Sequence, residues 1–160
     1  MQREFVCTNH TIVTAPRVFD IFSEYLYYLR TLNLGLTPFH IVCKYGHFKI
    51  MEIFIDNTYD LNIDLNNKDN QGLTGLHWAC LKGHSKIVKV LLERSIPLGI
   101  YLNSKDNCGN TEFHYACRYG HSDIAEMLIK NHSDKNIDLN AQDNEGWTGF
   151  HWACIKGKAI

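Results

Sequence analysis

The sequence lacks a hydrophobic run that could cross a membrane. A transmembrane helix needs about 20 consecutive apolar residues, whereas the most apolar stretch, residues 18–36, is interrupted by Asp20, Glu24 and Arg30. The first five residues also lead into no signal-type apolar segment. We therefore expect an intracellular protein, cytoplasmic or nuclear, that does not bind membranes.

An excess of charge of one sign is also missing. The chain has 16 basic and 17 acidic side chains, a formal net charge of −1. A balanced chain has no overall field that attracts nucleic acid, so we expect no nucleic-acid partner. With 45% hydrophobic and 21% charged residues, the composition is globular rather than disordered.

Signatures of catalysis are absent as well. The sequence contains no glycine-rich phosphate loop, dinucleotide fingerprint or paired-carboxylate signature. Nothing brings together a nucleophile, a base and an orienting group. We predict no enzymatic activity and no cofactor.

The dominant feature that is present is an internal repeat of 37 residues, which decides the fold. Residues at five positions of the unit recur at this step over four copies, which chance does not produce. The series are Thr37, Thr74, Thr111, Thr148; His40, His77, His114, His151; Cys43, Cys80, Cys117, Cys154; Gly46, Gly83, Gly120, Gly157; and Gly35, Gly72, Gly109, Gly146.

Each unit is predicted to be a turn, a short helix, a tight link and a longer helix. In the second unit, residues 69–72 have turn chemistry and Thr74 is placed to cap the start of a helix. Gly83 ends that helix in the left-handed conformation, and the second helix begins near Ser85. Neither helix can bury its apolar face alone, so the units must stack.

These residues resemble the ankyrin repeat, in which an aspartate turn and a glycine precede Thr-Pro-Leu-His-x-Ala-Ala-x-x-Gly-His. The matching segments are TPFHIVCKYGH at 37–47, TGLHWACLKGH at 74–84, TEFHYACRYGH at 111–121 and TGFHWACIKG at 148–157. The resemblance implies an all-α solenoid of stacked helix-turn-helix units with β-turn loop tips. We predict full repeats at 33–68, 69–105 and 106–142, a truncated fourth at 143–160, and an N-terminal helical cap or degenerate repeat at 1–32.

The chain departs from the ankyrin pattern in two ways. The proline after threonine survives only as Pro38, and Gly75, Glu112 and Gly149 replace it. Glycine at a first helical position is expected to cost some stability. The period also exceeds the usual ~33 residues; the addition falls after the second helix, where Pro97 favours a loop over a further helical turn.

The spacing His-x-x-Cys occurs four times and puts both side chains on one helix face, where they could chelate zinc. The resemblance implies instead a structural histidine that ties the threonine end to neighbouring backbone, and a cysteine that packs as a small hydrophobic residue. Because stacked helices lie ~8–10 Å apart, equivalent sites do not converge on a metal or a disulfide. We predict no metal site, four buried cysteines and an exposed Cys108.

The resemblance further implies that a partner protein binds along the groove formed by turn tips and first helices. One basic and one apolar or aromatic residue precede each helix-ending glycine, which favours an acidic and apolar partner segment. The basic residues are also favourable at helix C-termini, by ~0.3–1 kcal/mol each. The predicted partner-binding residues are Lys44, Tyr45, Leu73, Leu81, Lys82, Asn110, Arg118, Tyr119, Trp147, Ile155 and Lys156.

Two further predictions concern single positions. Trp78, Tyr115 and Trp152 follow the structural histidines and are expected to pack between helices rather than contact a partner. Asn140, in Ile-Asp-Leu-Asn at 137–140, resembles ankyrin sites that an asparaginyl hydroxylase modifies, and is a candidate for hydroxylation. The alternative is a turn asparagine that bonds to local backbone.

We therefore predict a monomeric protein–protein interaction scaffold. Three alternatives remain open. A nucleic-acid-binding module is favoured only by the basic and aromatic residues of the groove, and a metal or redox module only by the His-x-x-Cys repeats. The array is alternatively the recognition part of a larger signalling, effector or ubiquitin-ligase adaptor protein.

Overall fold

The computed structural model describes residues 34–59 and 63–157, so the predicted cap at 1–32 lies outside the described residues. No strand occurs in the described ranges, which confirms the all-α prediction. The helices are α2 (Pro38–Tyr45), α3 (Phe48–Asp56), α4 (Gly75–Lys82), α5 (Ser85–Glu93), α6 (Glu112–Tyr119), α7 (Ser122–Lys130), α8 (His132–Lys135) and α9 (Gly149–Lys156).

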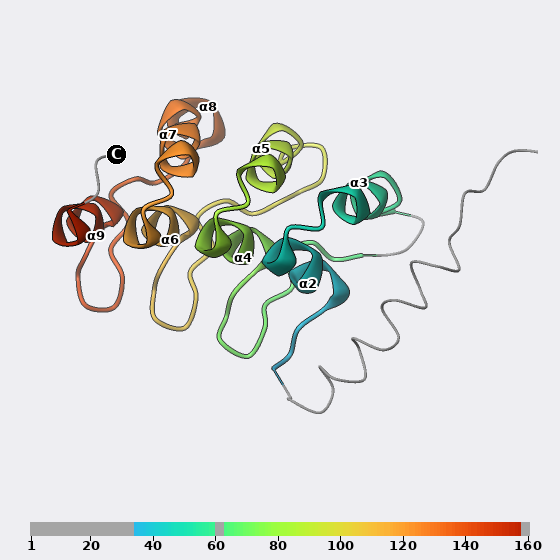
Figure 1. Ribbon diagram of the computed structural model, residues 1–160, viewed down its shortest axis with the longest axis horizontal. Helices are drawn as coiled ribbons and strands as arrows, with labels where there is room; N and C mark the ends of the chain where they lie inside the picture. Colours follow the sequence, from blue (N-terminus) through green and yellow to red (C-terminus); the bar gives the residue numbers. More distant parts are fainter. Residues whose placement is uncertain (1–33, 60–62, 158–160) are drawn as a thin grey trace, which may run out of the picture.

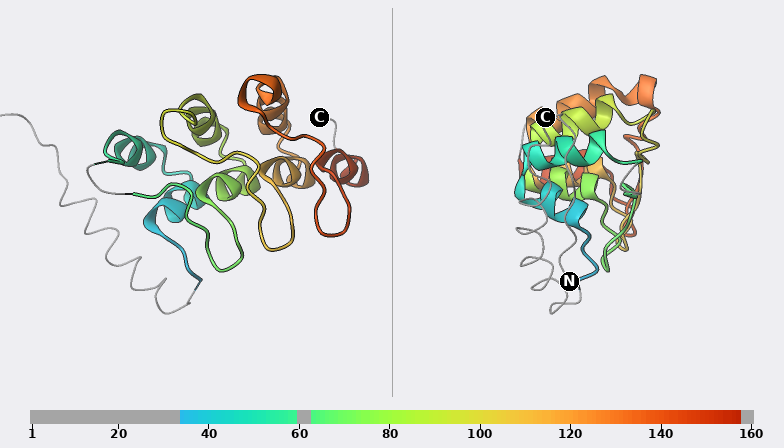
Figure 2. Two further views of the ribbon diagram at one scale, coloured as in Figure 1. Left: turned by 180° about the vertical axis from the view of Figure 1, so that it is seen from behind. Right: turned by 90° about the vertical axis from the view of Figure 1, so that its right-hand side faces the viewer.

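The helices form two parallel rows. Figure 1 shows the first helices α2, α4, α6 and α9 side by side, with α3, α5 and α7 in a second row and long turns projecting away from it. Each first helix packs against the next, and α3, α5 and α7 do the same in their own row. Seen along the stack in Figure 2, the rows make two layers with the turns at one edge. The predicted solenoid of stacked hairpins is confirmed.

The ends of the first helices follow from local chemistry. The side chains of Thr37, Thr74 and Thr148 each accept a hydrogen bond from the backbone N–H three residues later, as predicted for capping residues. All four first helices end at a glycine with φ between 59° and 77°. This left-handed conformation suits glycine because it has no Cβ.

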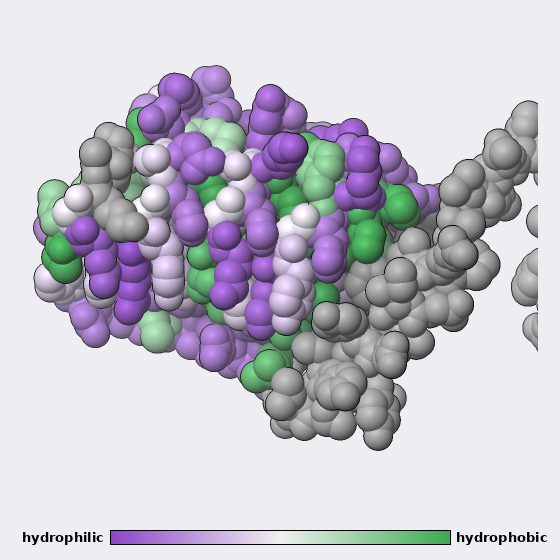
Figure 3. Space-filling view, viewed as in Figure 1, coloured by the Kyte–Doolittle hydropathy of each residue, from purple (hydrophilic) through white to green (hydrophobic). Residues whose placement is uncertain are grey.

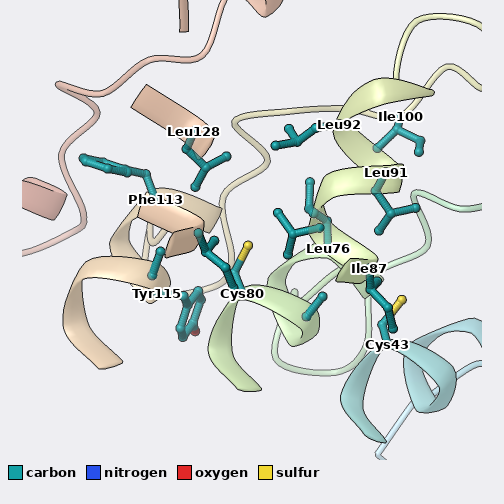
Figure 4. Close-up of a cluster of buried hydrophobic side chains, with 14 of the residues drawn as sticks. Cys43, Leu76, Cys80, Ile87, Leu91, Leu92, Ile100, Phe113, Tyr115 and Leu128 are labelled. Atoms are coloured by element: carbon teal, nitrogen blue, oxygen red, sulfur yellow. The ribbon is translucent and has the colours of Figure 1, made fainter. Parts of the chain in front are cut away.

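The core lies between the rows and is built from the facing sides of both kinds of helix. Figure 4 shows Leu91, Ile87 and Leu76 pointing into this space. Cys43, Cys80 and Cys117 are buried there as predicted, and burial raises the pKa of the Cys117 thiol to about 12. On the outside, Figure 3 shows hydrophilic side chains in bands across the stack, with apolar ones in smaller areas between them.

The prediction that Cys154 is buried is wrong. A methyl group at Gly75 would lie 3.1 Å from Cys43 Sγ, and one at Gly149 would lie 3.2 Å from Cys117 Sγ. The thiols of Cys43 and Cys117 are thus covered by the first helix of the following repeat. No helix packs on the far side of α9 within the described residues, and Cys154 is exposed.

The linkers that lengthen the repeat are ordered by side-chain bridges. The Asn66 amide donates to Gly99 O at 2.8 Å and accepts from Tyr101 N at 2.8 Å. Asn103 makes the same pair of bonds to residues 136 and 138. The linker after α5 has no helix, as predicted, but the linker after α7 contains α8, so the expectation of a plain loop is wrong there.

The replacement of proline by glycine at the first helical position has a packing reason. A methyl group at Gly75 would lie 2.6 Å from Phe39 Cε1, and one at Gly149 would lie 2.5 Å from Phe113 Cδ1. Where the preceding repeat has the smaller Leu76, the position holds Glu112. The glycines therefore make room for a phenylalanine ring of the preceding repeat, which offsets their cost in helix propensity.

We expect Gly75→Ala to destabilise the protein by about 1–3 kcal/mol, because it overpacks the contact with Phe39. Helix propensity alone predicts the opposite sign, a gain of about 1 kcal/mol. Urea unfolding of the wild type and the variant measures the difference.

The matched control is the double variant Phe39→Leu/Gly75→Ala, which reproduces the size pairing of Leu76 with Glu112. It should lose less stability than the sum of the two single variants. A stabilising Gly75→Ala, or strictly additive changes, would contradict the packing explanation.

Candidate partner-binding groove

The repeated histidines are structural, as predicted. The Nδ1 atom of His40 accepts a hydrogen bond from Thr37 N at 2.9 Å, so the proton lies on Nε2. That Nε2 atom donates to the carbonyl oxygens of Asn67 and Leu73 at 2.9 and 3.0 Å. Burial lowers the pKa of His40, which favours this neutral form.

The next two repeats use the same bond. His77 Nε2 donates to Asn110 O at 3.2 Å, and His114 Nε2 donates to Trp147 O at 2.9 Å. Both ring nitrogens of these histidines are therefore occupied by backbone and capping groups. In the part of the chain that the structure describes, no group of three or more His, Cys, Asp or Glu side chains could hold a metal ion.

The aromatic residue after each of these histidines is locked to the turn of its own repeat. Trp78 Nε1 donates to Asp69 Oδ2 at 3.0 Å, and Trp152 Nε1 donates to Asp143 Oδ2 at 3.0 Å. The Tyr115 hydroxyl donates to the equivalent aspartate at 2.6 Å. All three rings pack against the core, which confirms the packing prediction. The sequence analysis did not predict the hydrogen bond from each ring to its aspartate, although Asp69, Asp106 and Asp143 also recur every 37 residues.

Two of these rings also carry a cation from the preceding repeat. Lys44 Nζ lies 4.3 Å from the centre of the Trp78 ring, and Arg118 Cζ lies 4.3 Å from that of Trp152. Such cation–π contacts contribute roughly 0.5–1 kcal/mol at exposed sites. These contacts join neighbouring repeats, and they hold the positive charges of Lys44 and Arg118 over the indole rings of the next repeat.

Comparison with protein families agrees with this architecture. A family model described as ankyrin repeats in three copies matches residues 19–106, and a second one, described as ankyrin repeats in many copies, matches residues 98–148. The chain belongs to the ankyrin-repeat family. The first match begins inside the segment predicted as a cap or degenerate repeat, and the boundary near residue 33 stays a prediction. A search of curated proteins gives no match.

Membership of the family gives the general class of function. Ankyrin repeats are generally protein–protein interaction modules, and they are typically not catalytic. Across residues 34–59 and 63–157, no helix combines the length and apolar character needed to cross a membrane.

The predicted ankyrin groove residues divide by exposure. Two of them, Leu73 and Asn110, are buried. Three are half-buried: Lys44, Leu81 and Arg118. Six are exposed: Tyr45, Lys82, Tyr119, Trp147, Ile155 and Lys156.

Leu73 and Asn110 are not available to a partner, and their prediction as binding residues is wrong. They are only 2% and 6% exposed, because the following turn of the stack covers them. The Asn110 amide hydrogen-bonds to Asp106, and the carbonyl oxygens of both residues accept the histidine bonds described above. Motif position alone did not reveal this burial. Trp147 occupies the equivalent position and is 37% exposed.

The groove is more basic than the balanced composition suggested. The exposed or half-buried charges on the four first helices are Lys44, Lys82, Arg118 and Lys156. The one acidic residue on these helices, Glu112, is buried. Exposed carboxylates lie on the second helices, for example at Asp123 and Glu126, and on turns, as at Glu145. The second helices carry lysines as well, such as Lys86 and Lys89, so within the described residues it is the first row that presents charge of one sign.

Asn140 is exposed, and its backbone N–H donates to Asp138 Oδ1 at 3.0 Å. The equivalent Asn66 and Asn103 use their amides to hold the next linker, a role that the sequence did not suggest. Hydroxylation of Asn140 stays a prediction.

Glu112, the first residue of α6, is buried, and its side chain lies near His77 of α4. Its Oε2 atom accepts from Asn103 N at 3.1 Å, while Oε1 has no hydrogen-bond partner and lies 3.9 Å from His77 Nδ1. That Nδ1 atom already accepts from Thr74 N at 3.1 Å, so it carries no proton and forms no ion pair. Burial raises the pKa of Glu112. Folding therefore favours the protonated form of this carboxyl group relative to the unfolded chain.

A pH dependence of stability follows. Because the pKa is raised on folding, the contribution of Glu112 is fully present below the unfolded pKa of about 4.3 and is lost as pH rises through the folded value. We expect Glu112→Gln to be more stable than the wild type at pH 7, by about 1–3 kcal/mol, the cost of a buried unsatisfied acceptor. The advantage should disappear near pH 4, as measured by urea unfolding at several pH values.

The exposed variant Glu145→Gln is the control, and it should track the wild type at every pH. Equal pH profiles for Glu112→Gln and the wild type would show that Glu112 is ionised at no cost in the fold.

Proposed function

We propose that this ankyrin stack binds another protein, without catalysis, through a segment of acidic and apolar character that lies along the groove. The observation that carries the proposal is the charge of the first helices. Their accessible ionic side chains are all cations, one in each repeat, and their single carboxyl group is buried. An acidic partner segment is the complement of such a surface.

Aromatic and aliphatic side chains beside the cations supply the apolar part of the proposal. Tyr45, Tyr119 and Ile155 are 50%, 46% and 52% exposed. Tyrosine and arginine are enriched among residues that dominate binding energy at protein interfaces. The proposed surface consists of Lys44, Tyr45, Leu81, Lys82, Arg118, Tyr119, Trp147, Ile155 and Lys156.

The same basic and aromatic residues suggest single-stranded nucleic acid as a second candidate. Proteins of that class stack bases on exposed aromatic faces. Here the faces of Trp78 and Trp152 are covered by Lys44 and Arg118, and Tyr115 is buried. These three rings are thus not open to bases, and stacking would be restricted to the exposed Tyr45, Tyr119 and Trp147, which favours the protein partner.

We expect Tyr119→Ala to weaken capture of the partner by about tenfold or more, since truncation of a central aromatic contact costs upwards of 1–2 kcal/mol. The measurement is affinity capture from a source lysate, with mass spectrometry to name the partner and titration to give the Kd. Urea unfolding checks that the fold is intact.

Tyr101→Ala is the matched control, because Tyr101 is exposed too, at 67% against 46% for Tyr119, but lies on a linker outside the groove. Unchanged capture by a folded Tyr119→Ala variant would remove the proposal. Retention on a phosphate polymer that falls steeply with salt, without a protein partner, would favour nucleic acid instead.

A further inference from the structure

The residue types along the groove recur every two ankyrin units rather than every one. The residues before the helix-ending glycine are a cation and a tyrosine in the first and third repeats, Lys44-Tyr45 and Arg118-Tyr119. In the second and fourth repeats they are an aliphatic residue and a lysine, at 81–82 and 155–156. The first-helix segments TGLHWACLKG and TGFHWACIKG differ at only two positions. Groove chemistry therefore recurs at a spacing of 74 residues.

This double period places two equivalent clusters in the groove. The Trp78 cluster consists of Lys44, Tyr45, Trp78 and Lys82, and Lys44 Nζ lies 4.3 Å from the Trp78 ring centre and 5.8 Å from that of Tyr45. The Trp152 cluster consists of Arg118, Tyr119, Trp152 and Lys156, with Arg118 Cζ again 4.3 Å from the indole ring. Each cluster presents two cations from adjacent repeats beside exposed tyrosine.

Each cluster holds like charges without a dedicated counter-charge. Within residues 34–59 and 63–157, none of the four cations forms a salt bridge. Partial burial lowers the pKa of Lys44, and Lys82 lowers it further, while Asp69 opposes the shift. The carboxylate of Asp69 already accepts hydrogen bonds from Trp78 Nε1, Gln71 N and Leu73 N, so it is not a dedicated counter-ion for the two lysines. A carboxylate from outside the chain would relieve this repulsion.

The equivalent positions between the two clusters hold neither a cation nor a tryptophan. Leu81 stands where the other cluster positions have Lys44 and Arg118, and Tyr115 stands in place of a tryptophan. Tyr115 is buried, bonds to Asp106 and stacks on Tyr119 with ring centres 6.3 Å apart. The cation–tryptophan contact thus occurs twice, two repeats apart, with Leu81 and Tyr115 at the equivalent positions between the two clusters.

We propose that the Trp78 and Trp152 clusters are two equivalent subsites, each accepting one acidic side chain of the same extended partner segment. This inference rests on the proposed function. Stacked helices lie ~8–10 Å apart, so clusters two repeats apart are roughly 16–20 Å apart. An extended chain rises about 3.3 Å per residue, which separates the two acidic residues by five or six positions. A helical segment, rising about 1.5 Å per residue, would need eleven to thirteen.

The test is selection of 16-residue peptides from a random display library on the full chain, followed by titration of synthetic winners. We expect the selected peptides to carry two Asp or Glu residues five or six positions apart with apolar residues between them. Enrichment of peptides without this pair, or with a spacing near eleven, overturns the inference and leaves the proposed function standing. Failure to enrich any peptide removes both.

Charge-removing variants then assign the subsites. Lys82→Gln and Lys156→Gln should each weaken a selected peptide to a similar extent, about tenfold for a lost charge pair. Replacing one acidic residue of the peptide by glutamine should abolish the effect of one variant and leave the other intact. Lys86→Gln, on an exposed site of α5, is the control and should not change the Kd. Equal sensitivity to both variants after that peptide change would show that there are no separate subsites.

Discussion

The stack depends on one contact, the bond that the Nε2 atoms of His40, His77 and His114 each donate to a carbonyl oxygen of the following repeat. Its direction is fixed locally, because Nδ1 accepts the N–H of the capping threonine and so leaves the proton on Nε2. One side chain therefore caps its own helix and sets the position of the next repeat. The spacing of the groove follows from this bond, since equivalent residues are carried forward by the same step.

Repeats that share this bond are still not interchangeable, because side-chain size is matched between neighbours. A phenylalanine in one repeat requires the absence of a Cβ in the next, as at Phe39 with Gly75 and Phe113 with Gly149. The smaller Leu76 admits Glu112, which brings a buried carboxyl group and its cost. The alternation of packing and the alternation of groove chemistry thus have the same period, two repeats.

Local features were predictable from sequence, and contacts between repeats mostly were not. The threonine caps, the glycine stops and the structural histidines depend on residues three to nine positions apart, and the pattern of one unit suffices to find them. The burial of Leu73 and Asn110, and the exposure of Cys154, depend on whether a following repeat covers them. The bond from Trp78 to Asp69 lay within reach of a pattern search, because both residues recur with the period.

Net charge illustrates why a sum over the chain is a weak guide to recognition. The balance of 16 basic and 17 acidic residues removes any long-range field, but a partner in the groove is within a few ångströms of particular side chains. At that distance the arrangement of charge decides the interaction, since screening acts over about 8 Å at physiological ionic strength. Because the one carboxyl group on the first helices, that of Glu112, is buried, these helices present cations alone, and a chain of balanced charge acquires a locally positive surface.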